Sequence, residues 1–277
     1  MTQFIMSSPT AFGIQYEINP FMYGRIDQTN RTRAAQQWAE LRNTLIHIGG
    51  GVTVAPHGPE YCPDTVFIGD AGLVAGEQIL ISRFKNEERG AEEPFFHSYF
   101  VDEGFVVAEY DTPRVSREKL SFEGGDAIFN LATSILWLGV GQRTALEFKS
   151  CIEAFLEDET IVVRPLELID SRFFSLSTCF CPTEKGELLW YPPAFSDYSQ
   201  YTIELWYPKD RRIEISEADA LALACDSISM DSHLVMPEVS AELVDILLAR
   251  GYEVIQQDMS EFVQSGGGCK SLTLKLS

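Results

Sequence analysis

Residues 31–56, RTRAAQQWAELRNTLIHIGGGVTVAP, combine three signals in a fixed order. An amphipathic helical pattern runs to a group of glycines, and a short β-rich run follows. Glycine commonly ends a helix because it adopts the left-handed backbone conformation without steric penalty. The segment therefore predicts a helix that is followed directly by a strand.

A helix-like run followed by a β-rich run recurs at three further places along the chain, two of them with a glycine between the runs. FFHSYFVDEG precedes FVVAEY, RTALEFKSCIEAFLEDE precedes IVVRPLEL, and VSAELVDILLARG precedes YEVIQQD. Further strand-like runs lie between these segments: TVFIGDAGLV, QILISRF, DAIFNLA, ELLWYPPAF and SLTLKL. A recurrence at about 50 residues suggests repeated ββαβ-like units. Because no linker or low-complexity stretch separates two halves, we expect residues 1–277 to form a single α/β domain.

Composition and charge exclude several classes of protein. The 277 residues suffice for a sizeable core, and a hydrophobic content of 45% is ordinary for a soluble globular protein. No apolar run approaches the roughly 20 residues of a spanning helix, and the first residues lack the basic region of a secretory signal. A net charge of −20 disfavours nucleic acids and anionic membranes, because their phosphates would be repelled. We therefore expect a cytoplasmic protein.

The six cysteines are expected to be reduced thiols, most of them buried. Cys179 and Cys181 form C-x-C, which differs from the C-x-x-C spacing typical of zinc sites. No second cluster of cysteine and histidine completes a ligand set. We therefore expect neither a metal nor a cofactor.

Polar and charged residues lie where several strand-like runs end, which is where sites are usually built. The candidates are Asp70, Arg89, Glu123, Asp126, Arg143, Ser175, Ser177, Cys269 and Ser271. Each also has an ordinary structural interpretation. Gly-Gly-Asp is a common turn, Arg89 in a run of charges would be a solvated loop residue, and a lone cysteine is usually a small buried hydrophobe. RFFSLSTCFCP predicts a buried strand with Ser175 and Ser177 at alternate positions. In QSGGGCKSLTL (264–274), three glycines lead into an alternating run, which predicts that the last two candidates face the same side of a strand.

Taken together and in order, six segments resemble the guanidine-modifying superfamily with the pentein fold. They are YEINPFM, PDTVFIGDAGLV, FKNEERG, FEGGDA, RFFSLSTCFCP and EFVQSGGGCKSLTL. This superfamily contains arginine deiminases, dimethylarginine dimethylaminohydrolases, amidinotransferases and arginine dihydrolases. The resemblance implies an α/β propeller of five ββαβ units around a pseudo-fivefold axis, which agrees with the recurrence above.

The resemblance also implies a ligand, an arginine-like cationic α-amino acid, and assigns roles to the candidates. In this family carboxylates bind the planar guanidinium through bidentate hydrogen bonds, a cysteine thiolate attacks its carbon, and a histidine transfers protons. Asp70 and Glu123 match the guanidinium-binding acids, and Asp126 adjoins them. Arg89 and Arg143 match a pair that holds the α-carboxylate.

Three positions depart from the family pattern together. Ser175 stands in place of the histidine, Ser177 in place of a second guanidinium-binding aspartate, and Ser271 in place of the nucleophilic cysteine. None of the four histidines matches a catalytic position. Because a serine hydroxyl is a poor nucleophile without an adjacent base, the usual covalent mechanism is not expected. Cys269, two residues before Ser271, is an alternative thiol that would face the same cavity.

Two functions remain open on these residues. In the first, the protein is a repurposed enzyme in which Asp70 or Glu123 performs acid–base chemistry on an arginine-like substrate. In the second, it is a catalytically silent relative that binds a small molecule or a protein partner through the same anchors. We favour the first, and the sequence leaves homo-oligomer formation open.

Overall fold

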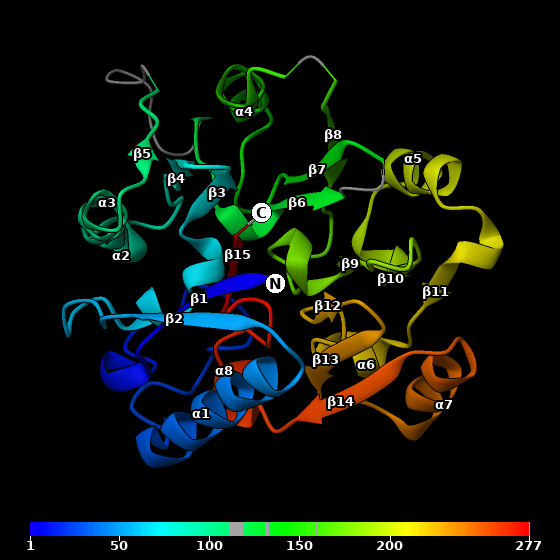
Figure 1. The fold of residues 1–277 in the computed structure, drawn as a ribbon, viewed down its shortest axis with the longest axis horizontal. Coiled ribbons are helices and arrows are strands. Elements are labelled where there is room, and N and C mark those ends of the chain that lie inside the picture. Colours follow the sequence, from blue (N-terminus) through cyan, green and yellow to red (C-terminus); the bar gives the residue numbers. More distant parts are fainter. Residues whose placement is uncertain (111–118, 131–132, 159, 277) are drawn as a thin grey trace.

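The computed structural model describes residues 1–110, 119–130, 133–158 and 160–276. Across these residues the strands form five three-stranded sheets, which Figure 1 shows arranged around a common centre. In each sheet the middle strand pairs antiparallel with one neighbour and parallel with the other. A parallel partner requires a crossover connection, and the predicted helices supply it. The predicted arrangement of five ββαβ units is therefore confirmed.

The elements follow one another sheet by sheet. The first sheet holds β15 (Leu274–Leu276), β1 (Gln3–Ser7) and β2 (Gly51–Ala55), with α1 (Arg31–His47) as its crossover. The second holds β3 (Gly72–Ala75), β4 (Gln78–Ile81) and β5 (Val106–Val107), with α2 (Glu87–Gly90) and α3 (Glu92–Asp102). The third holds β6 (Ala127–Asn130), β7 (Ile135–Val140) and β8 (Val162–Glu167), with α4 (Lys149–Leu156).

The remaining two sheets repeat this order. The fourth holds β9 (Phe180–Pro182), β10 (Leu188–Trp190) and β11 (Arg212–Glu214), with α5 (Asp197–Trp206). The fifth holds β12 (Ile228–Met230), β13 (His233–Pro237) and β14 (Glu253–Gln257), with α7 (Ala241–Ala249). Two short helices, α6 (Glu217–Leu221) and α8 (Ser260–Val263), lie in the connections between sheets.

Local signals explain the ends of the crossover helices. The side chain of Asn30 accepts a hydrogen bond from the Arg33 amide at the start of α1, and Ser240 caps α7 in the same way. Gly104 and Gly251 follow α3 and α7 with φ of 90° and 78°, a conformation that glycine adopts without strain. The helix–glycine–strand order predicted from sequence is thus present at these positions.

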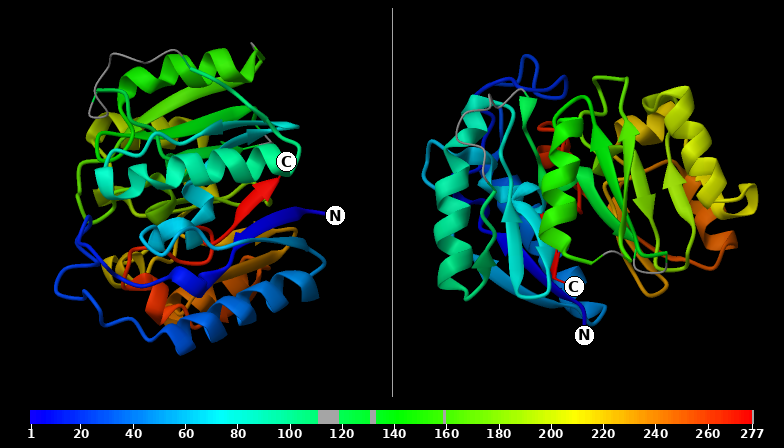
Figure 2. Two further views of the ribbon diagram at one scale, coloured as in Figure 1. Left: turned by 90° about the vertical axis from the view of Figure 1, so that its left-hand side faces the viewer. Right: turned by 90° about the horizontal axis from the view of Figure 1, so that it is seen from above.

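The first sheet is completed by segments from opposite parts of the chain. β15 pairs antiparallel with β1, so that Gln3 lies opposite Leu276. Figure 2 shows the two chain ends side by side in both views. This pairing closes the ring of sheets, because β1 would otherwise lack its antiparallel neighbour.

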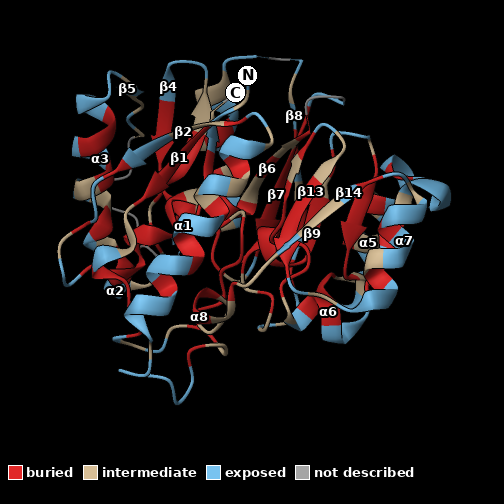
Figure 3. Ribbon diagram, turned by 60° about the horizontal axis from the view of Figure 1, so that its bottom comes forward, coloured by how far each residue is buried: buried red, intermediate tan, exposed pale blue. Residues whose placement is uncertain are grey.

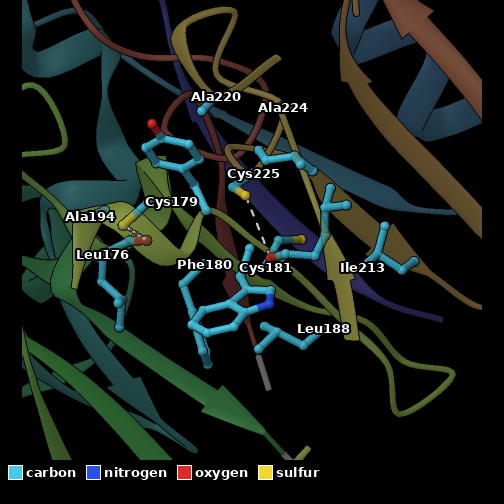
Figure 4. Close-up of a cluster of buried hydrophobic side chains, with 14 of the residues drawn as sticks. Leu176, Cys179, Phe180, Cys181, Leu188, Ala194, Ile213, Ala220, Ala224 and Cys225 are labelled. Atoms are coloured by element: carbon cyan, nitrogen blue, oxygen red, sulfur yellow. Dashed lines mark hydrogen bonds between the residues drawn. The ribbon is translucent and has the colours of Figure 1, made fainter. Parts of the chain in front are cut away.

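Most strands are buried and the outer faces of the helices are exposed (Figure 3), whereas the parallel outer strands β2, β5 and β14 are largely exposed or half-buried. Cys179, Cys181 and Cys225 lie in one apolar cluster with Phe180 and Leu188, as Figure 4 shows. All six cysteines are free thiols, and only Cys151 is partly exposed. None of the helices in the described part of the chain has the length and apolar character that a bilayer-spanning helix requires.

Three segments predicted as strands fold as turns instead. TVFIGD forms 3-10 helices at Pro63–Val66 and Ile68–Asp70, and the serine-containing RFFSLST forms one at Leu176–Thr178. The glycine segment 265–273 is also a series of turns, and its strand begins only at residue 274. These segments pack against one another rather than into a ladder. The amide of Gly69, for example, donates to the Ser271 carbonyl at 3.0 Å.

Candidate functional site

The turn segments bring six of the predicted site residues to one cavity. Asp70, Arg89, Arg143, Ser175, Ser177 and Ser271 all line it. The cavity volume is about 20 Å³, which is close to the space that one water molecule needs. In this structure the site is therefore closed, and its Asp70, Arg89 and Arg143 side chains form ion pairs with protein side chains.

Arg89 is the most firmly held side chain of the site. Its Nε and Nη2 donate to the two oxygens of Glu92, each at 2.9 Å, and its Nη1 donates to Asp70 Oδ2 at 2.7 Å. The guanidinium also lies 4.3 Å from the ring centroid of Phe84. Since the Arg89 side chain is only 4% exposed, these contacts form a buried ion network. The alternative of a solvated loop arginine is wrong.

Arg143 pairs with the second predicted acid. Its Nη1 lies 3.2 Å from both carboxylate oxygens of Glu123, and its Nη2 donates to the Ile18 carbonyl at 3.2 Å. The ring of Phe174 covers the guanidinium at 4.8 Å. Glu123 is 2% exposed, so this pair is also shielded from water. The two predicted arginines and the two predicted acids thus form matched buried pairs.

Asp126 stands apart from the cavity and holds backbone in place. Its Oδ1 accepts from the Leu176 amide at 2.8 Å, and its Oδ2 accepts from the Thr144 hydroxyl at 2.7 Å. Burial raises the pKa of this carboxyl to about 8. These contacts fix the segments that carry Arg143 and Ser175. They do not place Asp126 among the cavity-lining residues, where the sequence had predicted a substrate contact.

The two serines of RFFSLST face each other despite the turn. Ser175 Oγ and Ser177 Oγ are 3.4 Å apart. A Cβ on Gly125 would lie 2.3 Å from Asp70 Oδ1 and 2.7 Å from Ser175 Oγ, so only glycine fits at this point. Because Gly125 has no side chain, the Asp70 carboxylate and the Ser175 hydroxyl can both lie close to its Cα.

Cys269 does not share the cavity with Ser271. It lies fully buried in the apolar cluster that contains Phe4 and Met6, and it lines neither cavity described here. Burial holds the pKa of its thiol well above the ordinary value, which disfavours the reactive thiolate. The expectation that these two side chains share one face is wrong, because residues 269–272 are turns and the two-residue alternation of a strand does not apply.

Three acidic residues near the site were missed from the sequence. Asp64 is buried and lines the small cavity. Glu92 binds Arg89, and the signal for it in the sequence was an acidic residue three positions after an arginine, the spacing of an i,i+3 pair on a helix. Asp226 is fully buried, and its Oδ2 accepts hydrogen bonds from the amides of Gly268 and Ser271. Its signal was a charged residue within the otherwise small and apolar run ALACDSIS.

A second cavity lies on the other side of the same residues. It has a volume of about 640 Å³ and shares Asp70, Ser177 and Ser271 with the smaller one. Its walls are mostly apolar, Lys270 also lines it, and neither of the two site arginines does. The smaller cavity therefore has the chemistry for a zwitterionic amino acid, although the larger one has more room. Within the described residues, no cluster of histidine, cysteine and carboxylate side chains has metal-binding geometry.

Comparison with known proteins gives consistent relatives, although no family model matches the chain. ArgZ of Synechocystis, a bifunctional arginine dihydrolase/ornithine cyclodeaminase, is 39% identical over 274 residues, 99% of this chain and 37% of ArgZ. AgrE of Nostoc, described in the same terms, is 38% identical over 99% of this chain and 38% of AgrE. The chain thus spans well under half the length of these two relatives.

The solved structures show the same backbone. A cysteine-to-serine variant of the ArgZ N-terminal domain, bound to substrate, superposes with a TM-score of 0.93 at 38% identity, covering 100% of this chain and 98% of that one. A cysteine-to-alanine variant of AgrE with L-arginine gives 0.92 at 37%, covering 100% and 40%. A dimethylarginine dimethylaminohydrolase adduct gives 0.80 at 21% over 99% of both chains, which supports the fold alone.

Proposed function

Because this chain belongs to the pentein-fold guanidine-modifying superfamily, we propose that its site binds an arginine-like cationic α-amino acid and acts on the guanidino C–N bond. The observation that carries the proposal is that Asp70, Arg89 and Arg143 line one small cavity, with Glu123 bound to Arg143 behind it. Such a site complements a ligand with a guanidinium at one end and a carboxylate at the other.

Binding would proceed by exchange of ion pairs. The ligand's guanidinium would replace Arg89 as the partner of Asp70, and its α-carboxylate would replace Glu123 as the partner of Arg143. Arg89 would keep Glu92 as its partner, and Glu123 would pair with the ligand's guanidinium beside Asp70. No buried charge is then left unpaired, which avoids a penalty of several kcal/mol. The complexes of AgrE with L-arginine and of the ArgZ variant with substrate support this choice of ligand.

The closed cavity requires that part of its wall moves when the ligand enters. Ile18 and Asn19, in the segment YEINPFM, line the cavity. The Ile18 carbonyl accepts from Arg143, and the side-chain amide of Asn19 donates to the Ser265 carbonyl at 3.0 Å. We expect these two contacts to break on ligand entry, because they join the segment to the site.

The reaction class is hydrolysis of a guanidino C–N bond, with groups other than the usual thiol and imidazole. Ser175 and Ser271 occupy the positions where the family resemblance places those groups. An alternative function, a binding protein without turnover, is favoured by this replacement of both reactive groups with hydroxyls. The two functions share the ligand and differ only in chemistry.

Calorimetry and product analysis on the purified chain test both steps. L-arginine should bind, and agmatine, which lacks the α-carboxylate, should bind at least tenfold more weakly. Ammonia, urea, citrulline and ornithine would then be followed, with the ArgZ N-terminal domain as an active control. Failure of L-arginine, L-ornithine and agmatine alike to bind would overturn the ligand assignment, whereas binding without any product would establish the binding-protein alternative.

A further inference from the structure

We propose that Asp226 is the general base for Ser271, and that this pair takes over the roles of thiol and imidazole. The proposal deepens the proposed function and rests on it. It concerns a residue that neither the motif nor the family resemblance had singled out.

The contacts of Asp226 place it directly behind Ser271. Its Oδ2 accepts from the Ser271 amide at 3.3 Å and from the Gly268 amide, and the Ser271 side chain is close enough to lower the pKa of this carboxylate. Its Oδ1 is buried and has no hydrogen-bond partner within the described residues. A buried carboxylate oxygen without a donor is costly, and here it leaves one oxygen free to receive a proton.

Ser271 in turn sits between this carboxylate and the ligand. It lines both cavities, and its carbonyl is anchored by the Gly69 amide, one residue before Asp70. A guanidinium held by Asp70 would therefore lie in the cavity that Ser271 lines. The nucleophile Ser271 then lies between its base, Asp226, and the guanidinium held by Asp70, which is the arrangement that nucleophilic catalysis requires.

The charges around Asp226 suit a base. Burial raises the pKa of its carboxyl to about 6, and the Ser271 side chain and the Lys270 ammonium oppose the rise, whereas Asp70 adds to it. A carboxylate with a raised pKa accepts a proton more readily than an ordinary one, and near neutral pH it remains mostly ionised. Lys270 also lines the larger cavity, and burial lowers the pKa of its own ammonium.

The step balances without any further reactant than water. Ser271 Oγ forms a bond to the guanidinium carbon as its proton passes to Asp226. The protonated Asp226 donates that proton to the departing nitrogen, the C–N bond breaks, and ammonia leaves. Water then attacks the isourea-type ester, giving its proton through Asp226 to Ser271 Oγ. The net reaction converts a guanidinium and water to a urea group and ammonium.

The same carboxylate would oppose a cysteine at position 271. A negative charge within hydrogen-bonding distance raises the pKa of a thiol and disfavours the thiolate that would attack. Asp226 therefore favours a hydroxyl nucleophile and disfavours a thiol. Removing the Asp226 charge should therefore lower activity when residue 271 is serine and raise it when residue 271 is cysteine. A purely structural role for Asp226 would not produce these opposite effects.

The test compares wild type, Asp226→Asn, Ser271→Cys and the double variant. Asparagine keeps an oxygen for the amides of Gly268 and Ser271 but cannot take up a proton. We expect Asp226→Asn to lower kcat for L-arginine about 100-fold or more in the serine background, with KM little changed. In the cysteine background it should raise kcat. Equal effects in the two backgrounds, or no loss in the serine one, would overturn the proposal.

Labelling with a fluorophosphonate separates this proposal from the ligand assignment. Intact-mass and peptide analysis should find Ser271 labelled in wild type, and the label should be lost in Asp226→Asn and Ser271→Ala. Ser271→Ala leaves the loop's backbone contacts in place, so it serves if the asparagine variant does not fold. Labelling without arginine binding would refute the proposed ligand and support the pair. Arginine binding with neither labelling nor turnover would refute the pair and leave the ligand.

Discussion

Arg89 and Arg143 are equally buried, each with a side chain that is 4% exposed, yet their surroundings differ. Arg89 uses three nitrogens on two carboxylates, at 2.7–2.9 Å. Arg143 directs a single nitrogen at Glu123, at 3.2 Å, and gives another to the carbonyl of Ile18. The sequence suggested a symmetric clamp for an α-carboxylate, and the structure has an asymmetric one.

The difference shows which arginine can change partners. Glu92 binds the Arg89 guanidinium in a bidentate pair. A ligand carboxylate could bind Arg89 only by breaking these short charge-assisted hydrogen bonds. Arg143 has longer bonds, and one of them goes to a segment that must move for ligand entry. We infer that Arg89 chiefly stabilises the fold and that Arg143 chiefly holds the ligand carboxylate.

The largest expected effect is on stability, from Arg89→Ala. This change leaves Asp70 and Glu92 buried without their common partner, which should lower the free energy of unfolding by about 3–5 kcal/mol. Urea denaturation measures it, with Arg33→Ala as a matched control, because Arg33 pairs with Asp258 at the surface. A loss no larger than that of Arg143→Ala would remove the distinction between the two arginines.

Arg143→Ala should act mainly on ligand binding. The loss of its weaker bonds should cost about 1.5–3 kcal/mol of stability, less than for Arg89. L-arginine affinity should fall at least tenfold, whereas agmatine affinity should be unchanged, because agmatine has no α-carboxylate. Calorimetry with both ligands decides. Equal losses for the two ligands would show that Arg143 does not contact the carboxylate.

Asp126 holds the segment that carries Arg143, through its hydrogen bond with Thr144, and it should make the stability of the fold depend on pH. Its pKa is about 8 in the fold, and an aspartate in the unfolded chain has a pKa of about 3.9. The unfolded chain therefore loses this proton first, and the free energy of unfolding falls as pH rises from about 4 to about 8. Asp126→Asn should flatten this part of the curve. Parallel urea-denaturation curves for the two proteins across this range would contradict the assignment.

The smallest expected effect comes from Phe174→Leu. The ring stacks on Arg143, and loss of the cation–π contact should cost about 0.5–1 kcal/mol of stability. Arginine affinity should fall slightly, because the guanidinium is less well fixed. Thermal unfolding and calorimetry measure the two effects. A fall in affinity as large as that of Arg143→Ala would instead make the ring a direct ligand contact.

Sequence patterns predicted the parts of the fold that depend on local chemistry. The helix–glycine–strand order was correct at α1 with β2 and at α7 with β14, since helical periodicity, capping and glycine act within a few residues. The turns at Ile68–Asp70 and Leu176–Thr178 were predicted as strands. Their apolar residues are buried by segments distant in the chain, and a run of buried residues resembles a strand whatever buries it.

The site shows the same division. Family resemblance selected six residues that line one cavity, because motifs record which residue types the chemistry needs. It could not reveal that Asp70 pairs with Arg89, nor that Asp226 lies behind Ser271. Cys269 was misplaced for a related reason, since strand alternation was applied to residues that form turns.

What the sequence alone determined is the set of parts: crossover helices, short strands, and the acids, arginines and serines at fixed motif positions. What only the tertiary structure decided is which charges neutralise one another and which side chains share a cavity. Ion pairs and cavities form between segments far apart in the chain, and their energies depend on distance and burial. No pattern of neighbouring residues carries that information.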